Sequence, residues 1–92
     1  MRVFKQKYTD RKGQTRESSK WYVEFVDHRE IRRRLPGFTD EGATAELGRK
    51  VERLAEARSL HRPLDAELVR WLESMPTTMR ERLAKWGILD SR

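Results

Sequence analysis

The sequence has no cysteine, so a disulfide framework and a zinc site with cysteine ligands are both excluded. Its longest run of apolar residues is three, Trp21 to Val23, which is far too short to cross a membrane. The start of the chain, Met1-Arg2-Val3, has no apolar stretch that could act as a signal peptide. We therefore expect a cytoplasmic protein that does not associate with membranes.

The chain also has few of the patterns that carry catalysis. Its two histidines, His28 and His61, do not lie near a nucleophile pattern. No glycine-rich loop precedes a predicted helix, so a loop that cradles phosphates is not expected. The carboxylates are scattered among arginines, and no spacing typical of metal ligands appears. We expect no catalytic residue, no metal site and no cofactor in this chain alone.

Charge, in contrast, is abundant and unevenly distributed. Charged residues make up 39% of the 92 residues, against about 25% in an average soluble protein. A chain of this length has room for one small hydrophobic core. Residues 1–38 contain 11 Lys and Arg against 5 Asp and Glu, a net charge of +6, whereas residues 39–92 contain 10 of each. A one-sided excess in one segment is typical of a surface that binds a polyanion such as nucleic acid.

Three segments of the basic half have the pattern of β-strands. Residues 2–9, 20–26 and 31–35 combine β-branched and aromatic residues with an alternation of polar and apolar positions. The connections at residues 10–15 and 27–30 are short and contain residues that favour turns. Short connections of this kind predict an antiparallel three-stranded meander.

Alternation along a strand assigns successive side chains to opposite faces of the predicted sheet. The face toward the core is expected to hold six apolar residues: Phe4, Trp21, Val23, Phe25, Ile31 and Leu35. The face toward solvent is expected to hold six mainly basic or polar residues: Lys5, Lys7, Tyr22, Glu24, Arg32 and Arg34. Arg33 falls on the inner face, so we expect its stem to pack while its charged head extends to solvent.

Three helices are predicted after the sheet. Residues 39–41 are an N-cap signature for a long helix that runs to about Leu60 and covers the sheet with an apolar stripe. A second, short helix follows Pro63, and a capping box at residues 78–81 opens a third helix that Gly87 ends. The predicted fold is therefore α+β: a three-stranded antiparallel sheet packed against one long helix, followed by two short C-terminal helices.

The predicted outer face is the candidate binding site, because a two- or three-stranded sheet can enter the major groove of duplex DNA. Arginine fits guanine O6 and N7 with two parallel hydrogen bonds, and lysine neutralises phosphates. Tyr22 can pack against a sugar or a thymine methyl group, and Glu24 can accept from cytosine or orient an arginine. Protection of a sheet edge against aggregation explains one or two of the charges, but not four on one face.

A family resemblance rests on these strands and on the start of the long helix. The residues that carry it are VFKQKYTDRKGQTRESSKWYVEFVDHREIRRRLPGFTDEGATAELGRKVERL. This segment resembles the N-terminal arm-type DNA-binding domain of tyrosine recombinases, the site-specific integrases of phages and transposons. It is also similar, more loosely, to the GCC-box-binding domain of plant ethylene-response transcription factors. The tail PLDAELVRWLESMPTTMRERLAKWGILD resembles the helical segment that leads to the core-binding domain of integrases.

The resemblance implies that the sheet lies in the major groove and that the face away from the helix contacts DNA. Carried over position by position, the contact residues are Lys5, Lys7, Tyr22, Glu24, Arg32 and Arg34. Val26 departs from the family pattern, in which this place is often basic. The tyrosine nucleophile of the recombinases belongs to a distal domain, so neither Tyr8 nor Tyr22 takes that role. The chain is then expected to be an N-terminal fragment of a recombinase that can self-associate on DNA.

We therefore expect residues 1–62 to form an arm-type DNA-binding domain and residues 63–92 to form a helical linker or hairpin. The expected function is sequence-specific binding of duplex DNA. Two alternatives stay open: a basic module that binds an acidic protein, and an RNA-binding sheet with Trp21 or Phe25 exposed to solvent. The sequence also leaves open whether residues 64–89 pack on the rest of the molecule. Gly48, within the long helix, favours a close approach of that helix to the sheet.

Overall fold

Three antiparallel strands, paired in the order β1-β2-β3, form the sheet in the computed structural model, which describes residues 1–89. The strands are β1 (Arg2–Thr9), β2 (Thr15–Val26) and β3 (Arg32–Pro36). The helices that follow are α1 (Glu41–Ser59), α2 (Ala66–Ser74) and α3 (Thr77–Lys85). The predicted α+β fold class, with one long helix and two short C-terminal helices, is confirmed.

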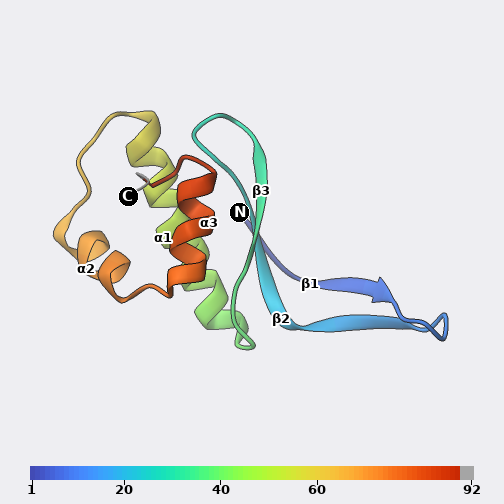
Figure 1. The fold of residues 1–92 in the computed structure, drawn as a ribbon. Helices are drawn as coiled ribbons and strands as arrows, with labels where there is room; N and C mark the ends of the chain where they lie inside the picture. Colours follow the sequence, from blue (N-terminus) through green and yellow to red (C-terminus); the bar gives the residue numbers. More distant parts are fainter. Residues whose placement is uncertain (90–92) are drawn as a thin grey trace.

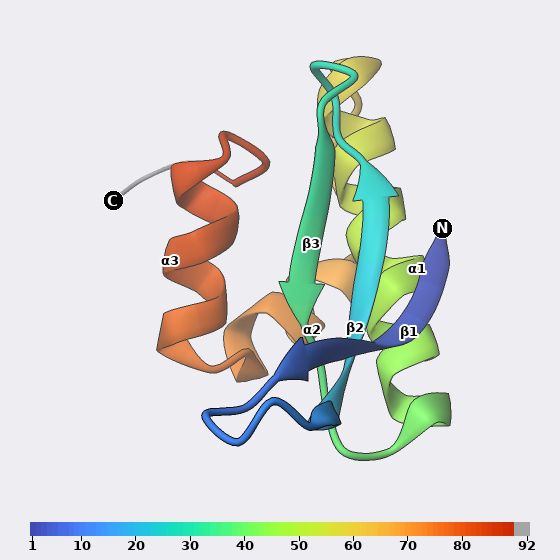
Figure 2. The same ribbon diagram turned by 90° about the vertical axis from the view of Figure 1, so that its right-hand side faces the viewer.

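The described helices all lie on one side of the sheet (Figure 1). Figure 2 shows the sheet from its other side, where no described helix lies in front of the strands. A sheet with one covered face satisfies the requirement that its apolar face be buried against another layer. The other face is left available for a partner.

One hydrophobic cluster joins the sheet to all the described helices. Its buried members are Val23, Phe25, Leu35, Leu47, Val51, Leu54, Leu68, Met75, Leu83 and Ile88. Leu68 comes from α2 and Leu83 from α3, so the C-terminal helices contribute to the same core as the sheet and α1. This answers the question that the sequence leaves open: residues 64–89 pack on the rest of the molecule.

The long helix begins and packs as its sequence predicts. Asp40 is its N-cap residue, and the carboxylate accepts a hydrogen bond of 2.7 Å from the backbone N–H of Ala43. Gly48 lies directly against β2, because a Cβ atom at this position would be only 3.0 Å from Cγ1 of Val23. The close approach of helix and sheet that Gly48 favours is therefore present.

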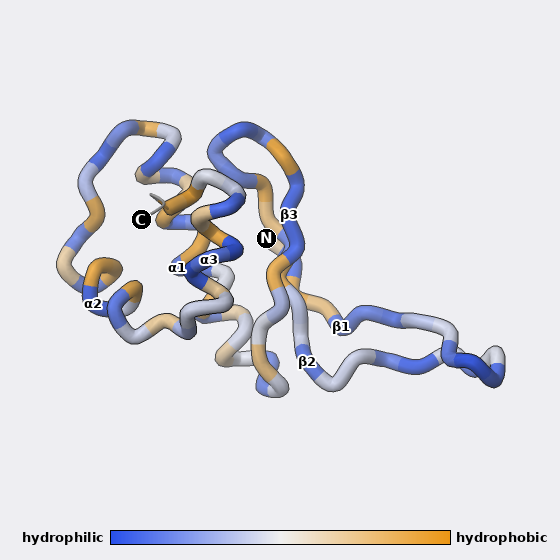
Figure 3. The backbone as a smooth tube through the Cα atoms, viewed as in Figure 1, coloured by the Kyte–Doolittle hydropathy of each residue, from blue (hydrophilic) through white to orange (hydrophobic). Residues whose placement is uncertain are grey.

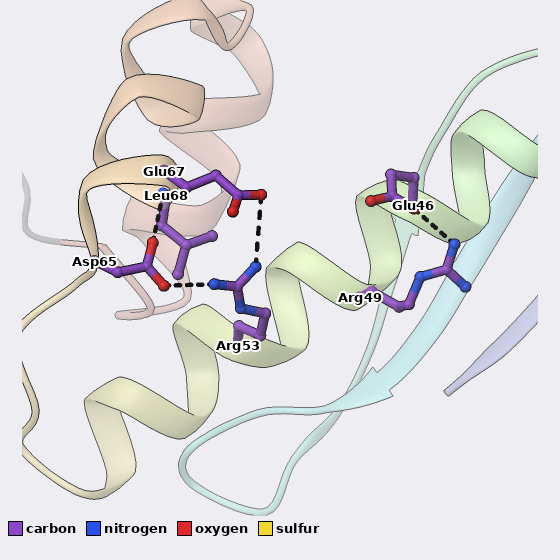
Figure 4. A network of polar contacts seen from close by, with 6 residues as sticks. All are labelled: Glu46, Arg49, Arg53, Asp65, Glu67 and Leu68. Carbon is purple, nitrogen blue, oxygen red and sulfur yellow. Dashed lines mark hydrogen bonds and ion pairs between the residues drawn. The ribbon is translucent and has the colours of Figure 1, made fainter.

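A network of charged residues fastens α2 to α1 (Figure 4). Asp65 caps α2 by accepting a hydrogen bond of 2.8 Å from the backbone N–H of Leu68. The same carboxylate forms an ion pair with Arg53 of α1. Nη1 of Arg53 also lies 3.9 Å from Oε1 of Glu67. Asp65 therefore fixes both the start of α2 and its place beside α1.

The last helix confirms one prediction about its ends and contradicts the other. At its start α3 begins at Thr77 with Pro76 as N-cap, which has no side-chain acceptor, so the predicted capping box at residues 78–81 is wrong. At its end Gly87 has a φ of 78°, and the N–H of Ile88 donates to the carbonyl of Leu83 at 3.0 Å. This is the Schellman arrangement that the sequence predicts.

The first strand faces the core with a different set of side chains from the predicted one. Val3, rather than Phe4, lies opposite Val23 and shares its face. Phe4 lies opposite Tyr22 on the uncovered face of the sheet. Since side chains alternate along a strand, a shift of one residue moves the whole set to the other face. The prediction of Phe4 as a core residue is therefore wrong.

Two further residues of the predicted inner face behave differently from expectation. Ile31 is 43% exposed, because β3 begins only at Arg32 and Ile31 still belongs to the preceding turn. In that turn the N–H of Asp27 donates to the carbonyl of Ile31 at 2.9 Å. Arg33 faces inward as expected, but its head does not extend freely to solvent: its Nε donates at 2.8 Å to Asp27, whose side chain is completely buried, and the Arg33 side chain is only 23% exposed. A buried carboxylate thus keeps the Arg33 guanidinium half-buried.

The first two strands continue beyond the sheet as a hairpin, which we call the arm and define as residues 7–17. The pairing of β1 with β2 is irregular between Lys5 and Lys7, and the arm begins where regular pairing resumes with Lys7 opposite Glu17. Figure 1 shows the arm extending away from the helices, and Figure 2 shows it on the uncovered side of the sheet. The arm makes the molecule elongated, with extents of 49 × 25 × 24 Å.

Candidate nucleic-acid interface

The uncovered side of the sheet, which we call the open face, collects side chains from all three strands. Directly opposed residues share a face, and two rows of three residues across the strands define this one: Arg2–Glu24–Arg34 and Phe4–Tyr22–Pro36. Its members are Arg2, Phe4, Tyr22, Glu24, Val26, Arg32, Arg34 and Pro36. The face therefore combines three arginines, one carboxylate and two aromatic rings.

Glu24 lies at the centre of the arginines. Nε of Arg34 donates to its carboxylate at 2.9 Å, and guanidinium nitrogens of Arg2 and Arg32 lie 3.6 and 3.9 Å from it. The Glu24 side chain is only 12% exposed, whereas the side chains of these arginines are between 56% and 73% exposed. The carboxylate is therefore screened from solvent by three cations that remain accessible.

The charge state of Glu24 follows from these contacts. The hydrogen bond from Arg34 holds the pKa of the Glu24 carboxyl below its ordinary value, and the positive charges of Arg2 and Arg32 act in the same direction. Glu24 is thus ionised at neutral pH. With one negative and three positive charges, the cluster has a net charge of +2 and presents its cations outward.

Two aromatic rings lie beside the arginines on the same face of the sheet. The rings of Phe4 and Tyr22 stack with centroids 6.0 Å apart and an interplanar angle of 30°. The guanidinium carbons of Arg2 and Arg34 lie 4.4 and 5.3 Å from the centroid of the Phe4 ring. These cation–π contacts restrict the side-chain freedom of both arginines, so less entropy is lost when a partner binds.

The arrangement leaves donors of Arg34 available for a ligand. A guanidinium carries five N–H groups in a rigid fork, and the hydrogen bond to Glu24 uses the one on Nε. Within residues 1–89 the terminal amino groups of Arg34 have no hydrogen-bond partner. A pair of free N–H groups on an oriented arginine is what bidentate recognition of guanine or phosphate requires.

The structure brings together four of the six predicted site residues, Tyr22, Glu24, Arg32 and Arg34, on the open face. Lys5 is not among them: it lies opposite Trp21, and its Nζ is 5.3 Å from a ring centroid of that tryptophan. Lys7 is also elsewhere, on the arm. The prediction that both lysines share the face of Tyr22 is therefore wrong, because the alternation of β1 is shifted and then interrupted.

Arg2 and Phe4 also belong to the open face. The predicted alternation takes Phe4 as the inward-facing residue of the first strand and therefore does not place either of them there. The available signal is the residue between them. If Val3 is taken as the inward-facing residue, Arg2 and Phe4 both turn outward. The β-branched Val3, opposite the buried Val23, is thus a better indicator of the inward face of β1 than the aromatic Phe4.

Other kinds of site find no support in the described residues. Residues 1–89 contain no group of three or more His, Asp or Glu side chains that could hold a metal ion. None of the helices described for this chain has the length and apolar character to cross a membrane. No protein-family model, curated protein or solved structure matches the chain.

Proposed function

We propose that this chain binds duplex DNA through the open face of its sheet, with the strands in the major groove. The observation that carries the proposal is the arginine cluster around Glu24 on a sheet face that no described helix covers. Affinity comes mainly from phosphate neutralisation, and sequence readout comes from Arg32 and Arg34 at base edges. Glu24 acts as a positioning residue that holds the arginines side by side.

The resemblance of residues 3–60 to arm-type domains extends the proposal. In this role the chain is the accessory DNA-binding domain of a site-specific tyrosine recombinase and works in the cytoplasm. It has no catalytic residue of its own, since the catalytic tyrosine belongs to a distal domain of such enzymes. Association of recombinase molecules on DNA belongs to the same proposal.

The geometry favours duplex DNA over a stacking platform for single-stranded RNA. Such a platform would need Trp21 or Phe25 in solvent, but Phe25 is only 2% exposed, and Trp21 is partly buried with Nζ of Lys5 5.3 Å from a ring centroid. Phe4 on the open face is engaged by the guanidinium groups of Arg2 and Arg34. Stacking of a base requires an accessible ring face. If the partner is instead an acidic protein, the open face recognises it by charge, and no preferred nucleic-acid sequence is selected.

The first test is selection of bound duplexes from a random pool, followed by a salt titration on the selected duplex. Four to six phosphate contacts predict that the logarithm of affinity falls with the logarithm of salt concentration at a slope of roughly −4 to −5. Fluorescence anisotropy measures this slope directly. A slope near zero, or equal displacement of every duplex by heparin without any enriched sequence, contradicts the proposal.

A further inference from the structure

We propose that the arm is a second DNA contact, which binds phosphates outside the base pairs covered by the open face. The inference rests on the proposed function and extends it from one surface to two. Four properties of the arm carry it: its exposure, its fixed bend, its ordered tip and its unpaired cations.

The arm has no part in the hydrophobic core. Every residue from 6 to 17 is exposed except Asp10, which is half-buried. Figure 3 shows hydrophilic colours along the arm to its tip, while the hydrophobic colours gather in the helices and in the strands beside them. Burial therefore does not explain why the two strands continue beyond the sheet.

The bend at the base of the arm is held by specific hydrogen bonds. Between the pairs Lys5–Trp21 and Lys7–Glu17, β1 contributes one residue and β2 contributes three. The Ser18 hydroxyl fills this irregular step, because it accepts from the N–H of Gln6 at 3.0 Å and donates to the carbonyl of Lys20 at 2.7 Å. A bulge of this kind bends a strand and redirects it.

The tip of the arm is also ordered by a single carboxylate. Oδ1 of Asp10 accepts hydrogen bonds from the backbone N–H groups of Lys12 and Gln14, both at 2.9 Å. Oδ2 of Asp10 accepts from Nε of Arg16 at 2.6 Å, and Gly13 has the positive φ of 78° that the turn requires. The basic side chains at the tip are therefore carried on a fixed backbone, which lowers the entropy cost of binding.

The cations of the arm are largely unpaired. Asp10 is neutralised by Arg16, whereas Lys7, Arg11 and Lys12 form no ion pair within residues 1–89. Basic side chains on an exposed, preformed turn are suited to phosphates, which need charge rather than base-specific geometry. The arm thus supplies sequence-independent affinity next to a face that reads sequence.

The direction of the arm places these cations beside a duplex that sits on the open face. The arm lies on the same side of the sheet as that face (Figures 1 and 2). Its paired residues extend about 10 Å from the bulge at roughly 3.4 Å per residue. The major groove is only about 8.5 Å deep, so a projection of this length does not fit inside the groove beneath the sheet. It therefore passes outside the groove and flanks the phosphate backbone.

The test compares the double variant Arg11→Gln/Lys12→Gln with the control Arg62→Gln/Arg70→Gln. Both remove two exposed positive charges, but Arg62 and Arg70 belong to the side of the helices. We expect the arm variant to lower the steepness of the salt dependence by about 2, and to bind about 30-fold more weakly at ~0.15 M salt than wild type. Its preference among duplex sequences should stay unchanged. The control should keep the wild-type salt slope.

Duplex length provides a second, independent test. On a duplex trimmed to the selected site, the wild type and the arm variant should bind equally, and extending the flanks should strengthen only the wild type. If the arm variant keeps the wild-type slope on long duplexes, the inference is wrong and the proposed function stands. A loss of sequence preference would also overturn the phosphate assignment. If the wild type binds no duplex, the proposed function and this inference both fail.

Discussion

At the scale of single residues, Glu24 has a role that its contribution to stability does not explain. Exposed ion pairs contribute at most about 1 kcal/mol each to the free energy of unfolding. A carboxylate on a DNA-binding face also repels phosphates. What Glu24 provides is a fixed spacing of Arg2, Arg32 and Arg34, whose like charges would otherwise separate. In the proposed complex with DNA, this arrangement favours specificity at some cost in affinity.

Arg34→Ala and Arg49→Ala form a matched pair that separates base readout from charge. Both arginines pair with a glutamate, at 2.9 and 2.7 Å, and have side chains 56% and 59% exposed. Only Arg34 lies on the open face. We expect Arg34→Ala to cost about 1–3 kcal/mol on the preferred duplex and to reduce the ratio of specific to non-specific affinity. Arg49→Ala should leave this ratio unchanged, as measured by anisotropy at one salt concentration. Equal effects would indicate a purely electrostatic binder.

A second prediction at this scale concerns Asp27 and the pH dependence of the stability that its carboxylate provides. Burial opposes ionisation of this carboxyl, but hydrogen bonds from Arg33 and from the N–H groups of Ile31 and Arg29 outweigh it and lower its pKa. The folded state therefore binds the proton less readily than the unfolded state. Its stabilisation is complete above the ordinary carboxyl pKa of about 4 and is lost as pH falls through the lowered value.

Replacing Asp27 by Asn keeps an acceptor for the turn but leaves the half-buried charge of Arg33 without its partner. We expect Asp27→Asn to lower the free energy of unfolding by about 1–3 kcal/mol at neutral pH. Urea denaturation at a series of pH values should show this difference from wild type narrowing on acidification. Glu73→Gln, at an exposed position, is the control and should show no difference at either end. A difference that grows toward low pH would contradict the assignment.

At the scale of elements, the contact of α1 with β2 reverses a usual rule. Alanine in place of glycine inside a helix normally stabilises it by about 1 kcal/mol. At Gly48 the new methyl group would lie 3.0 Å from Cγ1 of the fully buried Val23, and would overlap the thioether of Met1. We expect Gly48→Ala to lower the free energy of unfolding by about 1–3 kcal/mol. In Gly42→Ala the methyl group meets only the exposed carboxylate of Asp40, so thermal unfolding should show no loss of stability.

The sequence predicts the elements well because each has a local cause. The strands follow alternation, the long helix follows the cap at Asp40, and the end of α3 follows Gly87. The phase of β1 depends instead on whether Val3 or Phe4 is taken as the inward-facing residue, and the bend at Ser18 depends on how two strands pair, which no local pattern specifies. Since these features decide where Lys5 and Lys7 lie, two of the six predicted site residues lie off the open face.

At the scale of the whole molecule, the charge asymmetry of the sequence becomes a spatial division. The excess positive charge belongs to residues 1–38, which form the sheet and the arm, while residues 39–92 have no net charge. The helices cover one side of the sheet (Figure 1), and the strand register places the arginine cluster on the other face. One side of the molecule therefore provides the core, and the other is left for the proposed DNA contacts.

The C-terminal helices decide whether the molecule unfolds as one unit. Leu83 of α3 is fully buried in the same cluster as Val23 and Leu35 of the sheet, and Trp86 packs edge-on against Phe25 with ring centroids 6.2 Å apart. A small chain has little hydrophobic core to lose, so these contacts are a large share of its total. The sheet is therefore expected to depend on them.

Leu83→Ala tests this dependence, with Leu60→Ala as a matched control at a half-exposed leucine. We expect Leu83→Ala to lower the free energy of unfolding by about 2–5 kcal/mol, because it leaves a cavity between α3 and the sheet. Leu60→Ala should change it by less than about 0.5 kcal/mol. In Leu83→Ala, hydrogen exchange at the amides of β2 should accelerate together with that of α3, and circular dichroism should show one transition. Faster exchange confined to α2 and α3 would instead identify a tail that unfolds by itself, and the sheet with α1 would then be the independent DNA-binding unit.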